Sequence, residues 1–155
     1  MQIYLLKNTH SEITLTEQND GILNLFTRVV LNLTRIIETF EFDGNKLGNT
    51  VFLIDYLHHN QNCSMTDISQ EIILTPSTVT RQIDKLVDWK LASRKVSKED
   101  RRKVVVKLTR KGEQAYKKFY DLRMGNISKI LENMTKKEVR ILEKLLEQIV
   151  SQYES

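Results

Sequence analysis

Residues that form turns are scarce in this sequence. Its 155 residues include 5 glycines and 1 proline, whereas average usage would give roughly 11 and 8. Because tight turns rely heavily on these two residue types, the chain should have few loops. The length is that of one domain, and a hydrophobic content of 40% is enough for a core. We therefore expect a single domain, residues 1–155, built mainly from helices.

The sequence carries no sign of membrane insertion or secretion. A membrane-spanning helix needs about 18 or more apolar residues in a row, and no such run occurs. Near the start, the apolar patch Ile3–Leu6 is too short for a secretion signal. The single cysteine, Cys63, cannot form an internal disulfide. We expect a cytoplasmic protein that does not contact a membrane.

Positive charge is concentrated in one segment of the chain. Residues 75–112 hold 12 of the 24 Lys and Arg residues but only 4 of the 20 Asp and Glu residues, which gives this segment a net charge of +8. The remainder therefore carries a net charge of −4. A basic segment in an otherwise acidic chain is typical of a phosphate-binding surface, although a solvated basic face is an ordinary alternative.

Helical periodicity dominates the first third of the chain. Apolar residues recur at spacings of three and four between Ile22 and Phe40. Thr16 or Asp20 could cap the start of this helix. Asp43-Gly44-Asn45 then interrupts the helix. A second helix should carry the apolar residues from Leu47 to Leu57 and fray in the polar run that follows.

Two short helices are predicted next. Ser64 with an acid three residues later, in Ser64-Met65-Thr66-Asp67, marks the start of a helix over about 65–72. Thr75-Pro76 marks a second start, because proline is well tolerated at the first helical position, and this helix should run to about residue 89. The residues expected to face inward are Ile68, Ile72, Val79, Ile83 and Leu86. The pair forms a helix-turn-helix.

The pattern then changes to that of a β-hairpin. Ala92–Ser97 and Lys103–Leu108 are predicted strands, and the charged run between them is the hairpin tip. On the second strand, one face should hold Val104, Val106 and Leu108. A helix-turn-helix followed by a basic hairpin is a winged helix. The predicted fold class is therefore mainly α with a small β-hairpin wing.

Two further helices should follow the hairpin. Thr109 can cap the first, and Thr135-Lys136-Lys137-Glu138 is a capping box for the second. Steps of three and four on the last helix match a two-helix seam through Val139, Leu142, Leu146, Ile149 and Tyr153. We interpret residues 16–40 and 113–155 as dimerisation helices around a DNA-binding module at 44–112. Packing within one chain is the alternative.

The stretch from Ser64 to Tyr116 resembles the MarR (multiple antibiotic resistance regulator) family of transcription factors. The resemblance rests on PSTVTR, KLVDWKLASR, DRR and LTRKGEQ, which occur in family order and spacing. Ile73 and Lys90 stand where the family often has glycine. Glycine accepts a positive φ at low cost, so these two turns depart from the family pattern.

The resemblance implies a homodimer that binds a pseudo-palindromic operator in double-stranded DNA, typically as a repressor. A recognition helix would enter each major groove and a wing would reach each minor groove. Family members often bind a small aromatic or carboxylate effector that releases DNA, and Phe52 and Tyr56 would lie near that crevice by analogy. Whether this chain has an effector is left open, as is repression rather than activation.

Ten residues are the candidate DNA contacts: Ser77, Thr78, Thr80, Arg81, Lys85, Lys98, Asp100, Arg101, Arg102 and Lys103. Arg81 could bond a guanine edge or clamp a phosphate. Arg102 is the expected minor-groove residue, because the narrow groove enhances negative potential. In the family pattern, Asp100 orients Arg102.

Nothing in the sequence indicates an enzyme, a metal site or a cofactor. It has no glycine-rich phosphate loop, GxSxG or HExxH motif. His58 and His59 diverge by about 100° on a helix, so they cannot easily share an ion with Cys63. We expect Cys63 to be inert, although a helix start can lower a thiol pKa. The alternative function is a winged-helix module for protein interaction, without specific DNA binding.

Overall fold

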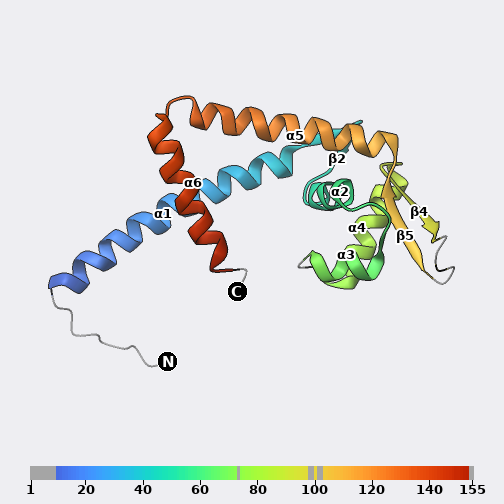
Figure 1. Ribbon diagram of the computed structural model, residues 1–155, viewed down its shortest axis with the longest axis horizontal. Coiled ribbons are helices and arrows are strands. Elements are labelled where there is room, and N and C mark those ends of the chain that lie inside the picture. Colours follow the sequence, from blue (N-terminus) through green and yellow to red (C-terminus); the bar gives the residue numbers. More distant parts are fainter. Residues whose placement is uncertain (1–9, 73, 98–99, 101–102, 154–155) are drawn as a thin grey trace, which may run out of the picture. The chain divides into compact units, whose positions relative to one another are not determined.

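The computed structural model describes residues 10–72, 74–97, 100 and 103–153, and the side chains among them from residue 19 on. This part of the chain is mainly helical and contains two small antiparallel sheets (Figure 1). The mainly α fold class with a β-hairpin wing is confirmed. The chain divides into two compact units, residues 1–51 and 52–155, which are described separately below.

The first unit consists mainly of the helix α1 (His10–Thr39). The helix begins earlier than the predicted caps Thr16 and Asp20, so the predicted start was wrong. No residue between His10 and Asp20 is a glycine or proline, and therefore nothing local stops the helix from extending through this polar stretch. Gly21 lies inside the helix as well.

A small hairpin follows α1. It pairs β1 (Glu41–Phe42) with β2 (Asn45–Lys46). The two turn residues, Asp43 and Gly44, have φ values of 51° and 74°. Positive φ at both central positions is the signature of the two-residue hairpin turn that Asp-Gly favours. The predicted interruption is confirmed, but the hairpin itself was not predicted.

The helix α2 (Thr50–His59) begins at the end of the first unit and lies mostly in the second. It is followed by the helix-turn-helix, which α3 (Met65–Glu71) and α4 (Pro76–Asp88) form. Ser64 and Asp67 form the predicted capping box, and the side chain of Thr75 caps α4 with Pro76 at the first helical position. These predicted helix starts are confirmed. Ile72, predicted to face inward, is the half-buried C-cap of α3.

The second helix of the helix-turn-helix, α4, is the one that the resemblance implies as the recognition helix, and it is given that name below. It ends in a turn that uses the left-handed conformation. Lys90 has φ +61°. Its N–H donates to the carbonyl of Val87, and the N–H of Leu91 donates to the carbonyl of Leu86. This pair of bonds is the Schellman motif, which usually places glycine where Lys90 stands. Lys90 therefore adopts a positive φ although it is not a glycine.

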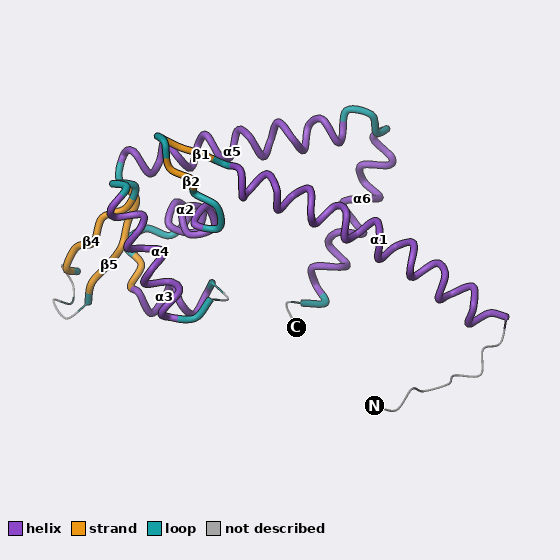
Figure 2. The backbone as a smooth tube through the Cα atoms, turned by 180° about the vertical axis from the view of Figure 1, so that it is seen from behind, coloured by secondary structure: helices purple, strands orange, loops and turns teal. Residues whose placement is uncertain are grey.

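The wing consists of β4 (Ala92–Val96) and β5 (Val104–Leu108), which pair in antiparallel register (Figures 1 and 2). A third strand, β3 (Cys63–Ser64), pairs with the other edge of β5, giving the order β3-β5-β4. This strand was not predicted, because two residues carry no periodicity. It ties the start of α3 to the wing.

The core of the second unit lies among α2, the helix-turn-helix and the wing. Its fully buried side chains include Leu53, Ile54, Leu57, Ile68, Val79, Ile83, Leu86, Leu91 and Val106. The predicted inner face of β5 is buried at Val106 and Leu108, while Val104 at the outer end is 43% exposed. Burial of this apolar surface is the main stabilising contribution to the module.

Two helices complete the chain: α5 (Arg110–Leu131) and α6 (Lys136–Ser151). Thr109 caps α5, and Thr135 with Glu138 forms the predicted capping box of α6. None of the residues of α6 is buried within a single chain. Among the described residues, no helix is long and apolar enough to span a lipid bilayer.

Candidate nucleic-acid interface

A cluster of hydroxyl groups opens the recognition helix α4. The oxygen of Thr75 accepts from the N–H of Thr78 at 3.3 Å. It also lies 3.1 Å from Ser77 Oγ and 2.9 Å from Thr78 Oγ1. A helix start with free N–H groups favours an anion such as a DNA phosphate. Ser77 is exposed and Thr78 half-buried, so Ser77 has the freer access to a ligand.

The exposed side of α4 carries two cations. Arg81 and Lys85 are exposed, whereas Val79, Ile83 and Leu86 on the other side have no accessible surface. Thr80 is exposed too, but its hydroxyl donates to the carbonyl of Pro76 at 2.9 Å. While that bond is made, Thr80 can offer only lone pairs to a ligand. The five predicted α4 residues therefore lie on one helix, with different capacities for donating to DNA.

Backbone hydrogen bonds close the base of the wing tip. The N–H of Ser97 donates to the carbonyl of Lys103 at 2.8 Å, and the N–H of Lys103 donates to the carbonyl of Asp100 at 2.9 Å. The Ser97 hydroxyl accepts from the N–H of Asp100 at 3.3 Å. Lys103 is exposed and Asp100 half-buried. The other predicted wing residues, Lys98, Arg101 and Arg102, lie outside the described residues.

An ion pair joins the recognition helix to the wing. Arg94 Nη1 on β4 lies 2.6 Å from Asp84 Oδ1 on α4. Neither residue is among the contacts predicted from the sequence. A signal was nevertheless available, because Arg94 is two residues from buried Ala92 and therefore shares its face of the strand. An arginine on the inner face of a hairpin indicates an acidic partner.

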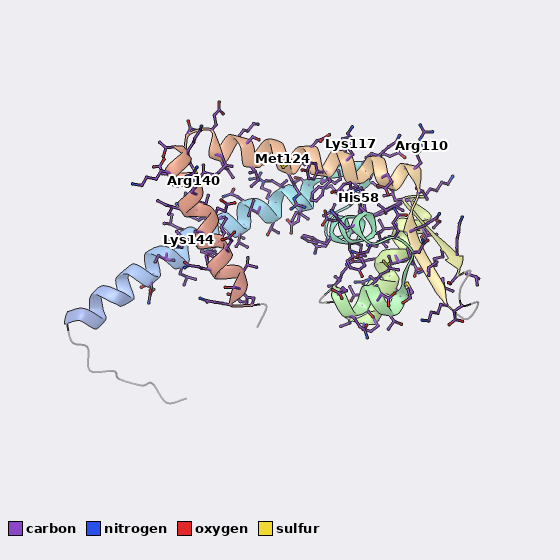
Figure 3. All side chains as sticks on the ribbon, in the orientation of Figure 1. His58, Arg110, Lys117, Met124, Arg140 and Lys144 are labelled. Carbon is purple, nitrogen blue, oxygen red and sulfur yellow. The ribbon has the colours of Figure 1, made fainter. Side chains whose placement is uncertain are left out.

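The two histidines of α2 have contacts that do not resemble a metal site. His58 Nδ1 lies 2.6 Å from Glu113 Oε2, and its ring stacks on Tyr116 at 3.6 Å between centroids. Figure 3 shows His58 on α2 beside α5. His59 Nδ1 bonds instead to the carbonyl of Asp55 at 2.9 Å. The described residues contain no group of three or more His, Cys, Asp or Glu side chains placed to hold a metal ion.

Cys63 is buried beneath the start of α3. Its thiol donates to the carbonyl of Asn60 at 2.9 Å. Burial raises the pKa of Cys63, outweighing the opposing effect of its hydrogen bond with Tyr56. Burial is also the main reason that the pKa of Tyr56 rises to about 12. A protonated, buried thiol is a poor nucleophile at neutral pH.

Proteins of known structure share this fold. A FabT structure from Streptococcus pneumoniae, solved in complex with DNA, has a TM-score of 0.74 and is 22% identical; the match covers 90% of this chain and 96% of that one. A MarR family protein from Bacillus stearothermophilus has a TM-score of 0.73 at 17% identity, covering 93% and 98%. At these identities the likeness shows a shared fold.

Sequence relatives are transcriptional regulators. The helix-turn-helix transcriptional repressor YetL of Bacillus subtilis is 27% identical over 143 residues, which cover 88% of this chain and 84% of that protein. The regulator BilQ of Clostridium symbiosum is 25% identical over 107 residues, covering 69% and 74%.

A sequence model of the MarR family matches residues 49–104. This segment runs from α2 through α3, the recognition helix and β4 to the start of β5. Members of the family are DNA-binding transcriptional regulators and not enzymes, in agreement with the prediction. The helix-turn-helix and the first strand of the wing thus lie within the segment that matches the MarR family of DNA-binding transcriptional regulators.

Proposed function

We propose that the protein is a homodimeric repressor that binds a pseudo-palindromic operator with the recognition helix and wing of each subunit. The observation that carries the proposal is the two-sided character of α4: Val79, Ile83 and Leu86 are fully buried, while Arg81 and Lys85 are exposed. A helix with a polar, cationic outer face suits base-edge and phosphate contacts in a major groove.

The ten candidate contacts divide between the two grooves. Ser77, Thr78, Thr80, Arg81 and Lys85 face the major groove, and Lys98, Asp100, Arg101, Arg102 and Lys103 act from the wing in the minor groove. Exposed Arg81 is the residue best suited to a guanine edge. Residues 44–112 form the DNA-binding module in this proposal, and residues 16–40 and 113–155 form the dimerisation helices.

Exposed apolar side chains on the terminal helices support a dimer. On α1 they include Ile22, Leu25, Phe26 and Val29, which are 52–63% exposed; on α6 they include Ile141, Leu145, Leu146 and Val150, each 50% exposed. Apolar surface on this scale is normally covered by a partner. The two-helix spacing of the apolar residues on α6 favours a second copy of the chain as this partner. The two half-sites should then lie one helical turn, about 10 bp, apart.

Repression follows if the bound dimer blocks a promoter. A small aromatic or carboxylate effector would release the DNA by binding better to a form in which the two recognition helices no longer match the half-sites. YetL is named a repressor, which supports this direction of control. The protein acts where the DNA is, in the cytoplasm.

Fluorescence anisotropy tests the proposal. The purified protein is titrated into a labelled duplex from the region upstream of its own gene, with an unrelated duplex of equal length as control. We expect tight binding of two subunits per site and a steep decline with salt. Light scattering should give the mass of a dimer. Equal weak binding to both duplexes contradicts specific recognition, and no binding at low salt favours the protein-interaction module instead.

A further inference from the structure

Asp84 is an acidic residue on a helix that is expected to approach DNA phosphates. Its side chain is 48% exposed, and its carboxylate lies 2.6 Å from the guanidinium of Arg94, which is 34% exposed. Arg94 is paired in register with Val106, whose side chain is fully buried. Paired residues share a face of the sheet, so Arg94 extends from the inner face of the wing to the recognition helix.

The position of Asp84 on α4 would allow its carboxylate to compete with DNA for the side chain of Arg81. The two residues are three apart on α4, a spacing at which opposite charges on a helix attract each other. Among the described residues, no ion pair engages Arg81, and the Asp84 carboxylate is bonded to Arg94 instead. Without Arg94, the nearest cation on the same helix face for Asp84 would be Arg81.

We propose that Arg94 is a positioning residue: it holds and neutralises Asp84, so that Arg81 stays free to bind DNA and Asp84 presents no uncompensated negative charge to phosphates. The inference rests on the proposed role of Arg81. Loss of Arg94 therefore weakens DNA binding through Asp84, and removal of the Asp84 charge restores it.

Two other roles for Arg94 make different predictions. If Arg94 itself bound a phosphate, its loss could not be repaired at Asp84. If the pair served only to brace the helix against the wing, loss of either partner would have the same effect. An ion pair this exposed contributes little to stability, so single substitutions should leave the protein folded. Thermal unfolding of each variant checks that they do.

The experiment measures the Kd of six variants, R81A, R94M, R94K, D84N, R94M/D84N and R81A/R94M, for the upstream duplex over a series of salt concentrations. R94M should bind about 5- to 20-fold more weakly, with a salt slope smaller by about one, as expected when Arg81 is withdrawn from DNA. R94K keeps the charge, and D84N removes the competitor, so both should bind within about twofold of the parent protein. R94M/D84N should match D84N.

The R81A background separates this inference from the function on which it rests. In R81A, the R94M substitution should no longer change the salt slope, which a merely structural role would not predict. If R81A binds like the parent protein, the proposed recognition surface is wrong and the inference falls with it. Three outcomes would overturn the inference alone. R81A could weaken DNA binding while R94M does not, or D84N could fail to restore the binding that R94M loses. In the third outcome, D84N alone would bind DNA as weakly as R94M.

Discussion

His58 Nδ1 lies 2.6 Å from Glu113 Oε2, so a hydrogen bond joins α2 to α5 across 55 positions of the chain. The His58 ring also stacks on Tyr116, one turn further along α5. Both partners of the bond are about one-third exposed, which limits its strength through solvent screening. We expect Glu113→Ala to lower the free energy of unfolding by about 0.5–1 kcal/mol.

Urea unfolding measures this effect, and Gln114→Ala is the matched control. Gln114 is the exposed neighbour of Glu113 on the same helix, so its substitution changes helix propensity without touching the bond. Equal stabilities of the two variants would show that the hydrogen bond does not hold α2 to α5.

The capping box of α3 should make stability depend on pH. Hydrogen bonds from the N–H and hydroxyl of Ser64 lower the pKa of Asp67 from its ordinary value of 3.8. A carboxylate with a lowered folded-state pKa stabilises the protein above the pKa of the unfolded state, and this contribution is lost as the pH falls through the folded-state pKa. We therefore expect stability to decline in acid, below about pH 4.

Asp67→Asn isolates this contribution. The amide can still accept from the Ser64 N–H but cannot titrate, so the variant should lose stability less steeply with acid than the parent protein does. Glu138 has a lowered pKa for the same reason in the capping box of α6, so part of the slope should remain in this variant. Identical pH profiles of the two proteins would contradict a role for Asp67.

Gly112 in α5 lies against the backbone of the turn that follows the recognition helix. A Cβ at this position would overlap the carbonyl of Leu91. Because a backbone carbonyl cannot move aside without displacing the turn after α4, Gly112→Ala should destabilise the protein by about 1–3 kcal/mol.

Gly125→Ala is the control for Gly112→Ala. Gly125 lies on the same helix, and a Cβ there meets nothing within 4 Å. The substitution should stabilise the protein by about 0.5–1 kcal/mol, because alanine restricts the unfolded chain. Thermal melts compare the two variants. A Gly112→Ala protein as stable as the parent would show that the turn after α4 can shift to accommodate the added methyl group.

Local chemistry explains which features could be predicted from the sequence. The helix starts at Ser64, Thr75 and Thr135 depend on a side chain and an N–H three residues away, so each is encoded in four residues. The pairing of Cys63 with Val106 joins positions far apart in sequence, so no local pattern predicts it. The contact between His58 and Glu113 is hidden for the same reason.

The candidate interface also contains both features that the sequence predicts and features that it does not. Exposure of Arg81 follows from its place opposite an apolar stripe, and helical periodicity alone predicts it. The partner of Asp84 depends on where the wing lies, which periodicity does not reveal. A scan of the sequence therefore finds the cations of a recognition helix more readily than the residues that keep those cations available.

Lys90 is the non-glycine residue that closes the recognition helix in the left-handed conformation, with φ +61°. This conformation costs an L-residue roughly 1–2 kcal/mol, part of which glycine recovers. Lys90→Gly should therefore raise the free energy of unfolding by about 0.5–1 kcal/mol. The same substitution at Lys129, which is exposed within α5, should lower it by about 1 kcal/mol. Urea unfolding of both variants tests the prediction, and a loss of stability in Lys90→Gly would mean that the lysine side chain contributes more than the strained backbone costs.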